Sequence, residues 1–122
     1  VVMVGADCGS SAIYFIMHGA KKVIAYEREG HLVRFFHENF KEYEAQVEWH
    51  GEWHGEYEDA DIFIMDCEGC EIGLDISRLA KYEVVIVAVH SWIPGFRGML
   101  MKLRGWRIQY VSDDAKELML KR

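Results

Sequence analysis

The stretch VVMVGADCGSSAIYFIMHGAKKVIAYE, residues 1–27, decides the fold. Its first five residues are apolar enough for a buried parallel strand that ends at Gly5. A short loop follows, and the serine pair after it can cap a helix that runs to about His18. Residues 22–26 predict a second strand. Two parallel strands joined by a helix form a βαβ unit, which crosses over right-handed almost always.

The loop after the first strand is the expected ligand site, because ligands of open parallel sheets bind beyond the carboxyl ends of the strands. Its glycines, Gly5 and Gly9, do not have the G-x-G-x-x-G spacing of dinucleotide-binding proteins. The phosphate-binding pattern G-x-x-x-x-G-K-[ST] is also absent. The loop carries one acidic residue, Asp7, and no basic one, which suits a cationic or polyhydroxyl ligand.

Glu27 indicates which ligand this is. It follows Gly5 by 22 positions, close to the offset of about 20 residues at which an acidic side chain meets ribose hydroxyls in nucleotide-binding βαβ units. A ribose without phosphates, next to a positive charge, describes S-adenosylmethionine. We therefore predict S-adenosylmethionine as the cofactor.

Composition limits the class of protein. The chain has 122 residues and 51% hydrophobic residues, enough for one domain with one core and too apolar for a disordered chain. The net charge of −6 does not favour nucleic acid as a partner, since duplex-binding domains usually carry a basic patch. No apolar run reaches the ~20 residues of a membrane span, and no signal peptide is recognisable.

These features predict a cytoplasmic protein that does not contact a membrane. Three cysteines without a secretory pattern predict reduced thiols. Because the chain opens inside a strand and without Met, we interpret it as a domain that lacks its N-terminal segment.

The rest of the chain continues the alternation of strands and helices. Further helices are expected at 31–43, 72–81 and 96–103, and further strands at 45–49, 62–65, 83–89, 106–111 and 117–120. Residues 50–59 are expected to form a loop. This order predicts an α/β fold with a mostly parallel sheet of about seven strands, helices on both faces and a terminal antiparallel hairpin.

This arrangement resembles the Rossmann-like class I methyltransferases, which are three-layer sandwiches with an antiparallel last strand. Residues 1–27 are similar to the first motif of these enzymes. IFIMDCEGCE, residues 62–71, is similar to the D-x-E-G-x-E signature of the FkbM family. The tail, EVVIVAVH and then LRGWRIQYVSDDAKELMLK, fits the same family. The resemblance covers nearly the whole chain and implies one FkbM-like domain, residues 1–122.

The resemblance also implies which residues bind the cofactor. Gly5, Asp7 and Gly9 would line its methionine part, and Glu27 would bind both ribose hydroxyls. Asp66 would lie near the methionine amino group or the transferring methyl, and residues 50–52 near the adenine. The complete predicted set is Gly5, Asp7, Cys8, Gly9, Glu27, Arg28, His50, Gly51 and Asp66.

We predict His90 and Glu68 as the catalytic residues. His90 follows a buried strand at the ligand side of the sheet, where it is either a general base for a hydroxyl proton or a hydrogen-bonded histidine at a strand end. Glu68 and Glu71 could hold a substrate hydroxyl, stabilise the start of the next helix through its dipole, or both.

Two further patterns have a metal-binding and a simpler interpretation. Cys67-x-x-Cys70 with Cys8 has a zinc or redox spacing, but small residues filling a tight loop explain it better. Histidine and glutamate alternate over residues 50–56, which suits a divalent ion, yet a solvated acidic loop is the preferred interpretation. We predict no metal. Aromatic residues near the site could stack on adenine or a sugar, or pack in the core: Trp49, Trp53, Tyr57 and Trp92.

The predicted function is methyl transfer from S-adenosylmethionine to a hydroxyl of a small molecule or carbohydrate. The alternative is a non-catalytic cofactor-binding or interaction module, since Met3 stands where these enzymes usually have an acidic residue. A nucleotide- or NAD-binding oxidoreductase is a third interpretation, which the glycine spacing disfavours. Exposed tryptophans are compatible with a homodimer.

Overall fold

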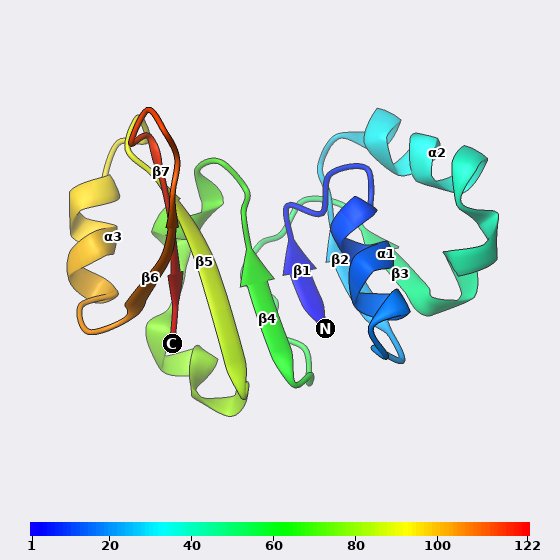
Figure 1. Ribbon diagram of the computed structural model, residues 1–122, viewed down its shortest axis with the longest axis horizontal. Helices are drawn as coiled ribbons and strands as arrows, with labels where there is room; N and C mark the ends of the chain where they lie inside the picture. The colour runs from blue at the N-terminus through cyan, green and yellow to red at the C-terminus, as the bar shows by residue number, and fades with distance from the viewer.

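The chain forms one sheet of seven strands in the order β3-β2-β1-β4-β5-β7-β6 (Figure 1). The computed structural model describes residues 1–122. The strands are β1 (Val2–Val4), β2 (Val23–Tyr26), β3 (Val47–His50), β4 (Ile62–Met65), β5 (Val84–His90), β6 (Arg107–Val111) and β7 (Glu117–Lys121). The α-helices are α1 (Ser10–Met17), α2 (Gly30–Asn39) and α3 (Phe96–Lys102). Three 3₁₀-helices complete the fold: η1 (Lys41–Gln46), η2 (Cys70–Gly73) and η3 (Ile76–Lys81).

Strands β1 to β5 are parallel, and β7 pairs antiparallel with both β5 and β6. The strand order reverses at β1, because the chain adds β2 and β3 on one side of β1 and β4 and β5 on the other. This topology confirms the predicted Rossmann-like fold with its terminal antiparallel hairpin. It also places the carboxyl ends of β1, β2 and β4 side by side, where such sheets bind ligands.

Each face of the sheet has its own hydrophobic core, as expected for strands buried on both sides. In β1, Met3 packs in the cluster that contains Ala12 of α1 and Phe36 of α2. The flanking Val2 and Val4 point the other way, into a larger cluster. That larger cluster includes Leu79 of η3, Met99 of α3 and Leu103 directly after α3. The helices therefore cover opposite faces, which makes the three layers.

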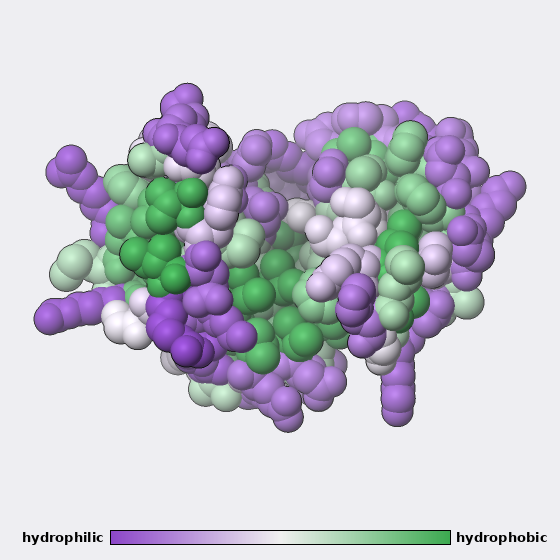
Figure 2. Space-filling view, viewed as in Figure 1, coloured by the Kyte–Doolittle hydropathy of each residue, from purple (hydrophilic) through white to green (hydrophobic).

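One part of the sheet carries no helix. Figure 2 shows apolar surface over β4 and β5, between α1 and α3. Alternate residues of these strands, Ile62, Ile64, Val84 and Ile86, are only half-buried.

No helix of the chain is long and apolar enough to span a bilayer.

Three boundaries differ from the prediction. The predicted helix at 72–81 is wrong, because η2 ends at Gly73 and η3 begins only after Asp75, whose carboxylate accepts the Ser77 N–H at 3.0 Å. The helix expected at 31–43 ends at Asn39, and its last residues belong to η1. Strand β3 consequently begins at Val47 rather than at residue 45.

Candidate functional site

A pocket of about 580 Å³ opens at the carboxyl ends of β1, β2 and β4. This volume lies within the range of small-molecule and cofactor sites, roughly 300–1,000 Å³. Six acidic side chains line the pocket: Asp7, Glu27, Glu29, Glu52, Asp66 and Glu68. Arg28 is the one basic residue of the lining, and it pairs with Glu29 at 3.4 Å. The pocket is therefore strongly negative.

Glycine at position 5 lets β1 and β4 end next to each other. Gly5 has a φ of +78°, and a Cβ there would overlap the carbonyl oxygen of Asp66. The backbone N–H of Gly5 donates to the Tyr26 carbonyl at 2.9 Å, and the N–H of Asp66 donates to the Val4 carbonyl at 2.8 Å. These contacts tie the ends of β1, β2 and β4 together beneath the pocket.

The carboxylate of Glu27, just after β2, is oriented by two backbone groups. The N–H of Asp7 donates to its Oε2 at 2.9 Å, and the N–H of Glu29 donates to its Oε1 at 2.9 Å. Asp7 has a left-handed φ of 51°, which belongs to the same tight loop as Gly5. Glu27 thus joins the loops after β1 and β2 and presents a positioned carboxylate to the pocket.

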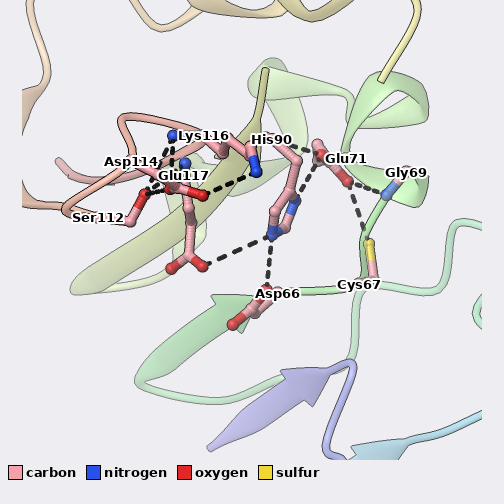
Figure 3. A network of polar contacts seen from close by, with 9 residues as sticks. All are labelled: Asp66, Cys67, Gly69, Glu71, His90, Ser112, Asp114, Lys116 and Glu117. Carbon is pink, nitrogen blue, oxygen red and sulfur yellow. Dashed lines mark hydrogen bonds and ion pairs between the residues drawn. The ribbon is translucent and has the colours of Figure 1, made fainter. Parts of the chain in front are cut away.

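A chain of polar contacts runs from Asp66 into the protein (Figure 3). His90, at the end of β5, lies between two carboxylates: its Nε2 is 3.3 Å from Asp66 Oδ1, and its Nδ1 is 3.0 Å from Glu71 Oε1. Glu71 is fully buried, and its carboxylate also accepts the Gly69 N–H at 2.6 Å and the His90 N–H at 3.3 Å. Glu117 of β7 reaches within 4.0 Å of the same Nε2.

Burial raises the pKa of Asp66 above its ordinary value, and the nearby charge of Glu117 adds to this. Glu68 and Glu71 act in the same direction, whereas His90 opposes them. Asp66 is therefore a stronger base than an exposed aspartate.

The expectation of reduced thiols is wrong for two of the three cysteines. Cys67 and Cys70 form a disulfide with a Cα–Cα distance of 5.6 Å, and Cys8 is free. Positive φ angles at Glu68 and Gly69, 52° and 137°, turn the chain so that the two cysteines meet. Both line the pocket. The Sγ of Cys67 lies 3.6 Å from Glu71, but as a disulfide sulfur it has no proton to donate.

The pocket brings together six of the predicted site residues: Gly5, Asp7, Glu27, Arg28, Asp66 and Glu68. Five others lie outside its lining: Cys8, Gly9, His50, Gly51 and His90. Gly9 has a packing role, because a Cβ there would overlap the ring of the buried Phe36. His50 stacks on Tyr26 with a centroid distance of 5.0 Å and bonds Glu48 at 2.8 Å.

Glu29 and Leu32 also line the pocket and were not predicted from the sequence. Two residues that the sequence did indicate line it as well: Glu52, from the range expected near the adenine, and Trp53, one of the aromatic residues expected to stack or to pack in the core. The indole N–H of Trp53 donates to the Glu56 carbonyl at 2.7 Å, which fixes the ring. The only sequence signal for Glu29 is its closeness to Glu27. No cluster of three or more His, Cys, Asp or Glu side chains is arranged to hold a metal ion.

The strand order and the position of the pocket define a Rossmann-like methyltransferase fold, and solved structures agree. The chain is similar to methyltransferase FkbM from Methylobacillus flagellatus, with a TM-score of 0.71 and 16% identity over 98% of this chain and 42% of that one. It is also similar to TrmK from M. capricolum, solved with S-adenosylhomocysteine, with a TM-score of 0.63 and 14% identity over 98% and 59% of the two chains. At these identities the likeness shows the fold alone.

Two viral proteins are related in sequence. Uncharacterized protein 65 of Sulfolobus islandicus filamentous virus (isolate Iceland/Hveragerdi) is 46% identical over 98% of this chain and 77% of its own length. Uncharacterized protein 158B of Sulfolobus islandicus rod-shaped virus 1 is 45% identical over 96% and 77%. The chain therefore belongs to the same family as these proteins of archaeal viruses. No model of a known protein family matches the sequence.

Proposed function

We propose that this chain binds S-adenosylmethionine and transfers its methyl group to a hydroxyl of a small molecule or sugar. The observation that carries the proposal is the carboxylate of Glu27, which two backbone N–H groups hold at the pocket. An ionised carboxylate offers about four lone-pair sites. Sites therefore stay free on both oxygens for the two hydroxyls of a ribose.

The remaining lining suits the other parts of this cofactor. The negative side chains of Asp7 and Asp66 would favour its ammonium and sulfonium charges. Of the residues expected near the adenine, Glu52 lines the pocket and His50 and Gly51 do not. We assign this contact to Glu52 and to Trp53, one of the aromatic residues expected to stack on adenine. When bound, the cofactor supplies an already activated methyl group, and the protein supplies alignment.

The charge of the pocket supports a neutral or cationic acceptor and argues against nucleic acid. Six carboxylates face one guanidinium, which is itself paired, so a phosphate backbone would be repelled. A hydroxyl group has no negative charge and would not be repelled by these carboxylates. Glu68, in the loop after β4, would accept a hydrogen bond from the acceptor hydroxyl.

A methyl-transfer assay tests this proposal. The purified chain is incubated with methyl-labelled S-adenosylmethionine and a panel of methyl glycosides, polyols and phenols, with RNA as a further acceptor. We expect label on a hydroxylated compound and an equal amount of S-adenosylhomocysteine. Label on RNA and on nothing else would contradict the proposed acceptor class.

The second candidate function is a module that binds S-adenosylmethionine without catalysis. Met3 favours it, because this side chain is 2% exposed in the core beside α1 and adds no polar group to the pocket. Cofactor binding without transfer to any acceptor would support this alternative. In both cases a cytoplasmic location stays a prediction.

A further inference from the structure

We propose that Asp66 is the catalytic residue that takes the acceptor proton, and that His90 and Glu71 act through it as positioning residues. This inference rests on the proposed methyl transfer. It changes the role that the sequence suggested for His90, which becomes the second member of a chain from the pocket into the core.

The first step of the argument is that Glu71 determines where the imidazole carries its proton. The carboxylate of Glu71 is fully buried and accepts hydrogen bonds from the backbone N–H groups of Gly69 and His90. An ionised carboxylate can only accept. The Nδ1 of His90, 3.0 Å from Glu71 Oε1, must therefore bear a hydrogen.

The second step is that only Nε2 of His90 can gain or lose a proton. Its neighbours are Asp66 Oδ1 at 3.3 Å and Glu117 Oε2 at 4.0 Å. Because Nδ1 already bears its hydrogen, a proton that Asp66 takes up can pass only to Nε2, and Glu71 stabilises the imidazolium that then forms.

The third step concerns which of these side chains an acceptor in the pocket can reach. The side chain of His90 is 2% exposed and does not line the pocket, whereas that of Asp66 is 44% exposed and does. A proton from an acceptor in the pocket can therefore reach His90 only by way of Asp66. Figure 3 shows Asp66 on the side of His90 opposite to Glu71.

The reaction balances with these groups. The acceptor oxygen forms a bond to the methyl carbon while the bond from that carbon to sulfur breaks, and the electron pair of that bond stays on sulfur. The hydroxyl proton passes to Asp66 and can continue to Nε2 of His90. The products are the methyl ether and S-adenosylhomocysteine, and the enzyme has gained one proton, which it later loses to water.

The surroundings make Asp66 a stronger base than an exposed aspartate. Glu117 from β7 and Glu68 and Glu71 from the segment after β4 face it with negative charge, and His90 from β5 is the one group that opposes them. Together with burial, these charges raise the pKa of Asp66.

The arrangement is tested first by ¹⁵N NMR of the histidine rings, with His90→Gln to assign the signal and the other imidazoles as internal controls. We expect neutral His90 to carry its proton on Nδ1, and Glu71→Gln to abolish this preference. A neutral His90 with its proton on Nε2 would overturn the inference. The measurement needs neither cofactor nor acceptor, so it decides the arrangement even if the proposed function fails.

The catalytic role is tested with the acceptor found in the transfer assay. Asp66→Asn should lower kcat, measured at saturating S-adenosylmethionine, by about 10²-fold or more. In His90→Gln the acid limb of the plot of rate against pH should move to higher pH. His90 lowers the pKa of Asp66, so without it Asp66 holds its proton more tightly. A role in packing alone would lower the rate without moving the limb.

Two results would overturn the role of Asp66. The first is weaker cofactor binding by Asp66→Asn with an unchanged rate at saturating cofactor, which would make Asp66 a cofactor ligand. The second is absence of transfer by the wild type to every acceptor. That result would also contradict the proposed function, and the NMR result would then stand alone.

Discussion

Gly5 lies so close to Asp66 that a Cβ at position 5 would overlap the Asp66 carbonyl oxygen. The two residues follow β1 and β4, neighbouring parallel strands whose carboxyl ends lie at the pocket. The strand order reverses at this point, so the contact determines how closely the two halves of the sheet approach beneath the ligand.

Gly5→Ala should therefore destabilise the protein more than its left-handed φ alone explains. Gly19→Ala is the matched control, because Gly19 has a φ of +96° and a Cβ at that position would have no atom within 4 Å. The control should lose about 1–2 kcal/mol from the backbone conformation alone. Urea unfolding of both variants checks this, and equal losses would show that the approach of β1 to β4 is not tight.

Glu71→Ala should be among the most damaging single substitutions in the chain. It leaves the N–H of Gly69 and two donors of His90 without their acceptor in the protein interior. Loss of one partner of a buried charged pair costs about 3–5 kcal/mol. Glu117→Ala, whose side chain is 28% exposed, should cost far less. Denaturant unfolding compares the two, and similar losses would argue against a buried Glu71.

Asp66→Asn should make the protein more stable at neutral pH. Because the folded-state pKa of Asp66 is raised, the native protein binds more protons than the unfolded chain between the two pKa values. Wild-type stability therefore falls as pH rises through that window, and an asparagine removes this loss. Thermal unfolding from acidic to neutral pH should show the two proteins converging at low pH, and a wild type more stable than the variant at pH 7 would contradict the raised pKa.

The disulfide between Cys67 and Cys70 should be detectable in solution. Alkylation of the unreduced, unfolded protein should modify Cys8 alone. Reduction should lower the stability by about 2 kcal/mol, the value for so short a loop. Cys8→Ser should respond to reductant like the wild type, whereas a variant with serine at positions 67 and 70 should not respond. Alkylation of all three cysteines without reductant would contradict the bond.

The sheet could be predicted because a short continuous stretch of sequence indicates each of its strands. Apolar runs such as residues 84–89 and the order of strands and helices define a parallel sheet. The same topology brings Asp7, Glu27 and Asp66 to one edge, because the carboxyl ends of parallel strands coincide. Residues that directly follow strands were therefore placed in the pocket from the sequence alone.

The features that could not be predicted depend on the conformation of segments outside the regular helices and strands. The loop after β3 has no periodic pattern that tells which of its residues reach the pocket: Glu52 and Trp53 line it, whereas His50 and Gly51 do not. The contact between His90 and Glu71 exists because Gly69 and η2 turn Glu71 inward, over a separation of 19 residues. The disulfide depends on two positive φ angles in the same turn. None of these leaves a signal in hydrophobic periodicity.

The measurement that tests the central claim most directly is calorimetric titration with S-adenosylmethionine and S-adenosylhomocysteine. It compares the wild type with Glu27→Ala and with Glu29→Ala, which removes an equal charge from the same pocket but keeps the N–H that bonds Glu27. We predict binding by the wild type and a loss of more than about tenfold, ~1.4 kcal/mol, in Glu27→Ala, with a smaller effect in Glu29→Ala. No binding by the folded wild type, or equal binding by Glu27→Ala, would contradict the proposed cofactor site.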